Sequence, residues 1–87
     1  MKKIKKSLLT EEERLDLPYY GRLADDYWRE WLPITYQRLA DEGTLYRTMY
    51  DLGMRVLDEQ QDLMRQGYSE DMAWELVKDQ IFRNPEV

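Results

Sequence analysis

Pro33 lies within the longest aromatic segment of the chain and limits how far any single helix can extend there. Apolar side chains recur around it at intervals of three or four residues, which is the period of an α-helix. The series is Leu23, Tyr27, Trp31 and Ile34, and it is widened by Trp28 and Leu32. Proline has no amide hydrogen, and its ring clashes with the carbonyl group four residues earlier. The segment is therefore either one kinked helix over about residues 20–41 or two shorter helices that meet at Pro33.

The N-terminal part of the chain combines a basic start with a short helix. Four lysines fall within residues 1–6, and we expect residues 1–9 to form a flexible basic tail. Thr10 and Glu13 then match a capping box, in which each side chain bonds the backbone amide of the other residue. This pattern predicts one or two helical turns over residues 10–16.

Glycines mark the limits of a long helix in the middle of the chain. Gly43 is suited to end the aromatic segment, because glycine readily adopts the left-handed angles that follow a helix. Thr44 is the expected N-cap of the next helix, over about residues 45–66, which Gly67 ends. Gly53, inside that helix, is unfavourable by about 1 kcal/mol relative to alanine. Its presence therefore indicates a close contact with another helix.

Ser69 is the expected cap of a last helix, which ends before Pro85. The face of this helix expected to be buried consists of Met72, Ala73, Leu76, Val77, Gln80 and Ile81. No segment shows the alternation typical of a strand. The sequence predicts an all-α protein, a small antiparallel bundle of three helices, or four if the proline breaks its helix. Residues 10–84 are expected to form a single helical domain and residues 85–87 a C-terminal tail.

The residue types that the chain lacks narrow its chemistry. It has no Cys and no His, which removes disulfides, thiolate nucleophiles, ordinary zinc ligands and the usual general base. No apolar run approaches the roughly 20 residues that cross a bilayer, and the first lysines are not followed by the apolar segment of a signal peptide. We expect a cytoplasmic protein with no cofactor, no bound metal and no catalytic residues.

Charge is distributed unevenly along the chain. The four lysines of residues 1–6 precede 81 residues that carry nine basic and eighteen acidic side chains, a net charge of −9. Such a body repels the phosphates of DNA and RNA. The charge pattern therefore argues against a broad nucleic-acid surface.

Several short motifs occur in an order that resembles a known family. They are Tyr20-Gly21-Arg22-Leu23, Tyr27-Trp28-Arg29-Glu30, Gly43-Thr44-Leu45-Tyr46 and Asp71-Met72-Ala73-Trp74, with Pro33, Tyr36 and Leu39 between the second and the third. By this order and spacing, residues 19–82 resemble the TnpV family of small transposon-encoded proteins. The resemblance implies a mobile-element origin and supplies no catalytic residues. Asp25 and Asp26 stand where family members are usually basic, which argues against a nucleic-acid role.

Two groups of residues are candidates for binding a partner. The acidic group is Asp25, Asp26 and Glu30, and the aromatic group is Trp28, Tyr46 and Tyr50. The acidic group is either half of a two-metal nuclease site or a solvated helix face, and we expect the solvated face. Most aromatic side chains belong in the core, but they are too many for a small bundle to bury entirely. We therefore place the aromatic group at a partner or dimer interface.

Arginines recur through the two main helices, at Arg22, Arg29, Arg38, Arg47 and Arg55. They form either a ridge that contacts phosphates or ion pairs with acids of their own helix. The pairs at helical spacing are Arg22 with Asp25 and Asp26, Arg47 with Asp51, and Arg55 with Asp58. Because pairs at this spacing stabilise a helix, we expect pairing.

Together these features predict a non-enzymatic accessory protein of a mobile genetic element, which acts by binding a protein partner. An acidic body is steered electrostatically toward a basic groove. A nuclease, transposase or recombinase is therefore the expected partner, and its modulation or inhibition, in the manner of small anti-CRISPR proteins, is the expected effect. The alternative is a DNA-binding accessory factor that uses the lysines of residues 1–6. Whether the protein is a monomer or a homodimer stays open.

Overall fold

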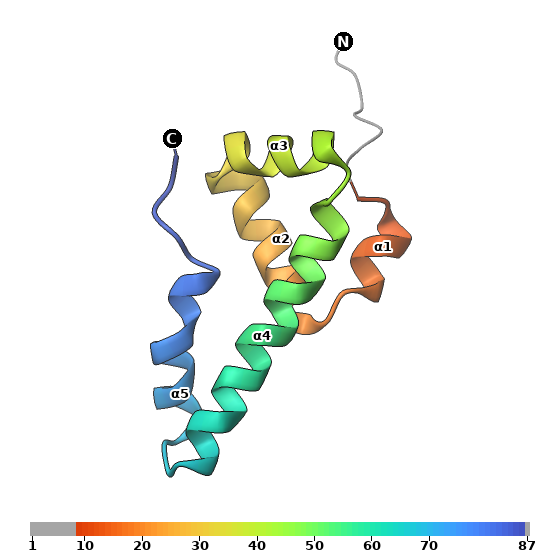
Figure 1. Ribbon diagram of the computed structural model, residues 1–87. Helices are drawn as coiled ribbons and strands as arrows, with labels where there is room; N and C mark the ends of the chain where they lie inside the picture. Colours follow the sequence, from red (N-terminus) through yellow and green to blue (C-terminus); the bar gives the residue numbers. More distant parts are fainter. Residues whose placement is uncertain (1–8, 87) are drawn as a thin grey trace.

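All regular structure is helical in the computed structural model, which describes residues 9–86 (Figure 1). The elements are α1 (Glu11–Asp16), α2 (Tyr19–Trp31), α3 (Pro33–Glu42), α4 (Leu45–Arg65), α5 (Glu70–Val77) and the 3-10 helix η1 (Lys78–Gln80). The all-α prediction is confirmed. The basic tail predicted at the N-terminus falls, except for Leu9, outside the described residues. None of the described helices has the length and apolarity that crossing a bilayer requires.

The aromatic segment forms two helices, so the proline breaks it rather than bending it. Leu32 leaves the helical region, with φ −124° and ψ 56°, and α3 begins at Pro33. Backbone bonds continue across the break, because the Leu32 amide donates to Trp28 O at 2.9 Å and the Tyr36 amide donates to Leu32 O at 2.8 Å. Figure 1 shows α3 turned across the end of α2.

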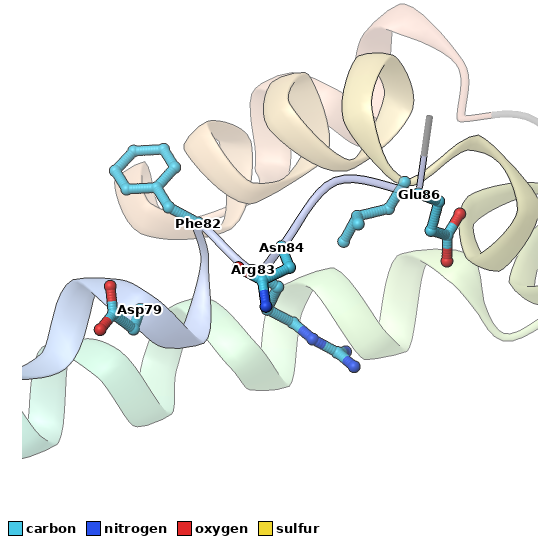
Figure 2. A pocket seen from close by; sticks show the side chains of 6 residues that line it. Asp79, Phe82, Arg83, Asn84 and Glu86 are labelled. Carbon is cyan, nitrogen blue, oxygen red and sulfur yellow. The ribbon is translucent and has the colours of Figure 1, made fainter.

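A segment after η1, residues 82–86, runs back toward α3 and is called the C-terminal strap (Figure 2). The Glu86 amide donates to Trp31 O at 2.8 Å. The Glu86 carboxylate accepts from the Ile34 amide at 2.8 Å, from the Thr35 amide at 3.2 Å and from the Thr35 hydroxyl. Leu32 makes no side-chain cap, so Glu86 satisfies amides that the break leaves free at the start of α3. At Glu86 the expected tail is thus an anchored segment.

Helices α2 and α4 cross where a glycine of each meets the other. A Cβ atom on Gly53 would lie 2.4 Å from the Gly21 amide nitrogen, and one on Gly21 would lie 2.8 Å from Met49 O. Both distances are shorter than any side chain tolerates. The close contact predicted from Gly53 is therefore confirmed, and Gly21 is its counterpart.

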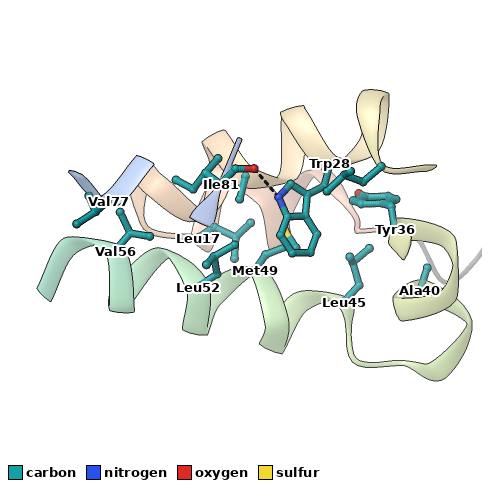
Figure 3. Close-up of a cluster of buried hydrophobic side chains, with 12 residues drawn as sticks. Leu17, Trp28, Tyr36, Ala40, Leu45, Met49, Leu52, Val56, Val77 and Ile81 are labelled. Carbon is teal, nitrogen blue, oxygen red and sulfur yellow. Dashed lines mark hydrogen bonds between the residues drawn. The ribbon is translucent and has the colours of Figure 1, made fainter. Parts of the chain in front are cut away.

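The core lies between α2, α3, α4 and the α5–η1 segment (Figure 3). Its buried side chains are Leu17, Ala24, Trp28, Leu32, Tyr36, Ala40, Leu45, Met49, Leu52, Val56, Val77 and Ile81. Trp28 occupies its centre and donates from Nε1 to Ile81 O at 2.8 Å. This bond satisfies the indole N–H in the interior and ties α2 to the end of the α5–η1 segment.

The predicted apolar stripe is confirmed in part. Leu23 and Tyr27 are half-buried against the core, and Trp28 and Leu32 are buried together with Ala24. The stripe is wrong at Trp31 and at Ile34 of α3, which are exposed. The reason is the glycine crossing, because residues that follow Gly21 at intervals of three and four turn toward α4. The last helix shows a similar split, and its predicted face is wrong at Met72 and Leu76, which are exposed.

Most of the predicted helix ends agree with the structure; the exception is Thr44, which occupies the N-cap position of α4 but makes no side-chain cap bond. Thr10 and Glu13 form the capping box, with bonds of 3.0 and 3.1 Å, and Ser69 Oγ accepts from the Met72 amide at 3.2 Å. Gly43 and Gly67 have the positive φ values expected after a helix, 78° and 109°. Local side-chain chemistry therefore sets where these helices begin and end.

Candidate protein-binding surface

The structure corrects the interpretation of the acidic group. Asp25 is fully buried, with 0% of its surface exposed, so the prediction of a solvated face is wrong for this residue. Asp26 and Glu30 are exposed. Asp25 points inward because it follows Gly21 by four residues and precedes Trp28 by three, on the face of α2 that packs against the core.

Asp25 is the centre of a polar network that joins three helices. Its Oδ2 accepts from Arg14 Nε at 2.7 Å and from Arg29 Nη2 at 3.2 Å, and its Oδ1 accepts from the Tyr36 hydroxyl at 2.6 Å. Arg14 also pairs with the exposed Asp26. The hydrogen bond to Asp25 raises the pKa of Arg14 above its ordinary value. Burial, reinforced by the bond to Asp25, raises the pKa of Tyr36 to about 12.

This network is structural in character. A buried charge is stable when it is paired and fully hydrogen-bonded, and no described buried side-chain polar atom lacks a partner. The network fastens α1 to α2 and α2 to α3. Within residues 9–86, no three acidic side chains are arranged to hold a metal ion.

The aromatic group is also divided by the structure. Trp28 is buried, and the Arg83 guanidinium covers its ring at 5.3 Å, so its predicted place at an interface is wrong. Tyr46 is half-buried and Tyr50 is 39% exposed, with their rings 6.0 Å apart on α4. Asp26, Glu30, Tyr46 and Tyr50 thus stay candidates for contact with a partner, on two different helices.

Ion pairing of the arginines follows other partners than those predicted. Among the described residues, Arg22, Arg47 and Arg55 form no ion pair, and the pairings predicted for these three arginines are therefore wrong. The intrahelical pairs observed are Arg29 with Asp25, Arg38 with Glu42 and Arg65 with Asp62, and Lys78 of η1 pairs with Glu75 of α5. Arg55 instead donates from Nε to Gln80 Oε1 at 3.1 Å, which links α4 to η1.

A continuous series of six aromatic rings, called the aromatic row, joins α2 to the α5–strap segment. In order of contact its members are Tyr19, Tyr20, Trp74, Phe82, Tyr27 and Trp31, with ring centroids 5.4, 5.0, 6.0, 5.1 and 6.4 Å apart. Tyr20 and Trp74 are stacked, with 16° between their planes. The row ends in exposed rings on both sides, since Tyr19 is 67% and Trp31 is 41% exposed. It is therefore partly core packing and partly accessible surface.

A surface hollow of about 250 Å³ opens at the Tyr19 end of the aromatic row. Its aromatic lining is Tyr19, Tyr20 and Trp74, and its polar lining is Gln60, Glu70 and Asp71. The Gln60 side chain is buried; its amide oxygen accepts from the Tyr20 hydroxyl at 2.7 Å and its amide nitrogen donates to Glu70 O at 3.5 Å. Burial raises the pKa of Tyr20, so its phenol is neutral.

A second hollow, of about 550 Å³, lies beside the C-terminal strap (Figure 2). Leu32 and Phe82 supply apolar lining, while Asp79, Arg83 and Glu86 supply charge. Arg83 and Glu86 are already engaged with Trp28 and with α3 respectively. These two charged groups therefore serve to hold the strap.

Trp74 and Phe82 belong to the aromatic row, but the sequence analysis did not place them among the candidate binding residues. Trp74 lies within α5 but outside the face predicted for the last helix, and Phe82 follows η1. A signal was present, because Tyr20 and Tyr27 share one flank of α2 and need an apolar partner from another element. Sequence spacing alone does not identify which element supplies it.

Comparisons with known proteins supply no further assignment of this surface. No protein-family model matches the chain, and searches of curated proteins and of solved structures found no similar protein.

Proposed function

We propose that this chain is a non-enzymatic accessory protein of a mobile genetic element, which binds a basic surface on a protein partner in the cytoplasm. The mobile-element origin rests on the resemblance of residues 19–82 to the TnpV family. The mode of action rests on the charge and the aromatic side chains of the surface.

The distribution of carboxylates is the observation that supports this proposal most. All eighteen acidic residues of the chain lie within the described region, which contains nine basic residues. Five of the acidic residues form ion pairs in this region, namely Asp25, Asp26, Glu42, Asp62 and Glu75. The thirteen others form none among residues 9–86. Unpaired surface carboxylates create a negative potential that accelerates association with a basic partner.

The aromatic row offers side chains that can make specific contacts with such a partner. Tyr, Trp and Arg dominate the binding energy of protein interfaces. Tyr19 and Trp31 expose a large part of their rings at the two ends of the row. Charge brings a basic partner close, and the exposed rings then supply apolar contact area.

The partner class follows from the charge. Enzymes that process nucleic acid carry basic grooves for the phosphate backbone, and an anionic protein competes for the same groove. A nuclease, transposase or recombinase is therefore the partner that we propose, with inhibition or modulation of its action on DNA as the result.

The test is to capture partners from the native host on the immobilised chain and to assay each for DNA processing. We expect a DNA-processing enzyme that elutes as salt rises and whose activity on DNA falls when the purified chain is added. The absence of any such enzyme among the captured proteins would refute the proposal. Retardation of duplex DNA by the chain at about 20 mM salt, lost on deletion of residues 1–6, would favour the DNA-binding alternative.

A further inference from the structure

We propose that the hollow between α2 and α5 receives an arginine side chain of the basic partner. The inference rests on the function proposed above and assigns one site to it. The site is formed by Tyr19, Tyr20 and Trp74 together with the carboxylates of Glu70 and Asp71.

The size of the hollow suits one side chain better than a free small molecule. Pockets that enclose a drug-sized ligand span roughly 300–1,000 Å³, whereas this hollow measures about 250 Å³. It is open to solvent beside the exposed ring of Tyr19. A side chain attached to a partner's backbone can enter it without being enclosed.

The aromatic lining favours a flat cation. Aromatic faces attract cations through the ring quadrupole, and a guanidinium group adds planar stacking that an ammonium group lacks. Tyr20 and Trp74 are stacked on each other, and Tyr19 meets Tyr20 edge-on at 5.4 Å, so three rings line one small space. Such a lining favours a guanidinium over an ammonium group.

The carboxylates give the hollow a negative charge. Neither Glu70 nor Asp71 has an ion-pair partner within residues 9–86. The buried amide of Gln60 carries no charge, and both its oxygen and its nitrogen bond groups of the protein, Tyr20 and the Glu70 carbonyl. The charge-bearing groups free to meet a ligand are therefore negative, and a guanidinium bonds carboxylates in a matched fork geometry.

Acids in the first turn also stabilise a helix through its dipole, whether or not a ligand binds. Helix α1 provides a matched control, because Glu11 and Glu12 hold the same positions there and are exposed. Neutralising either pair changes the net charge by the same amount and weakens a helix start in the same way. A difference in ligand binding between the two double variants therefore measures the contribution of the hollow itself.

The experiment titrates the full chain with a fluorescent hexa-arginine peptide, and with hexa-lysine for comparison. Glu70→Gln with Asp71→Asn is compared with Glu11→Gln with Glu12→Gln, after circular dichroism confirms folding. We expect the first pair to weaken arginine binding by about tenfold or more and the control pair by less than about twofold. The indole N–H resonance of Trp74 is expected to shift on binding.

A second comparison removes a ring instead of a charge. Tyr19→Leu keeps an apolar side chain at an exposed position, and Tyr68→Leu, at an exposed tyrosine between α4 and α5 that does not line the hollow, is its control. We expect only Tyr19→Leu to weaken binding and to reduce the preference for arginine over lysine.

Each outcome separates the site from the wider proposal. Equal weakening by the two neutralised pairs would overturn the site and leave binding by the anionic body intact. Absence of hexa-arginine binding to any variant at low salt would overturn both. Tighter binding after deletion of residues 1–6 in the otherwise unchanged chain, but not in the chain with Glu70→Gln and Asp71→Asn, would assign the hollow to the chain's own lysines, and that result would also overturn the assignment to a partner.

Discussion

Replacing Asp25 by asparagine should destabilise the fold far more than the same change at Asp26. Asp25 accepts three hydrogen bonds in the interior, two of them from arginines. Removing one member of a buried ion pair costs about 3–5 kcal/mol when the remaining charge is left uncompensated. The side chains of Arg14 and Arg29 are 24% and 47% exposed, so water compensates part of that loss. We therefore expect D25N to lower the free energy of unfolding by about 2–3 kcal/mol.

The neighbouring residue provides the control. The Asp26 side chain is 67% exposed and its pair with Arg14 lies at the surface, where such pairs contribute about 0.2–1 kcal/mol. Thermal unfolding followed by circular dichroism measures both variants. In a domain of this size 1 kcal/mol shifts Tm by about 4–8 °C, so D25N should lower Tm by about 8–24 °C and D26N by about 1–8 °C. Equal shifts for the two variants would refute the reasoning that burial of Asp25 gives the network its strength.

Three further predictions concern the backbone crossing and the titrating groups. G53A should lower Tm although alanine favours a helix by about 1 kcal/mol, because its Cβ would meet the Gly21 backbone; an unchanged or higher Tm would contradict the crossing. The raised pKa of Tyr36 means that its contribution to stability is present below pH 10 and is lost as pH rises through about 12. Y36F should therefore lack the tyrosinate absorbance that appears last in an alkaline titration of the folded protein. If Y36F kept that absorbance, the raised pKa would not belong to Tyr36. The Thr35 hydroxyl and the backbone amides of Thr35 and Ile34 lower the pKa of Glu86, so its anchoring is present above the ordinary carboxyl range and is lost as pH falls below it. The Ile34 amide resonance should shift on acidification in the wild-type chain and stay constant in E86Q, and identical acid titrations would exclude the strap contact.

The ends of the helices could be read from the sequence, because capping is a local property. Thr10 meets Glu13 three residues away, and Gly43 needs only its own freedom of φ to end α3. The close helix contact at Gly53 could also be predicted, because a glycine inside a long helix is unfavourable unless another helix packs closely against it. These features depend on residue type and on near neighbours, which a sequence displays directly.

The orientation of each helix could not be read in the same way. Apolar side chains surround α2 so widely that two neighbouring faces suit the core almost equally, and Gly21, which decides between them, carries no side chain to mark a face. Burial of Asp25 depends on Arg14 and Tyr36, which come from the helices before and after its own. The candidate surface depends on Trp74 meeting Tyr20 across more than fifty residues. Such contacts follow from the packing of whole helices, and spacing within one helix does not encode them.

The anchoring of Glu86 has a consequence for how the molecule is made. The carboxylate that caps α3 lies 52 positions after the amide it binds at Ile34, so a growing chain presents α3 long before its cap has been synthesised. Closing so long a loop also makes this contact a slow one to form. The bend between α2 and α3 should therefore be the last part of the nascent chain to become fixed.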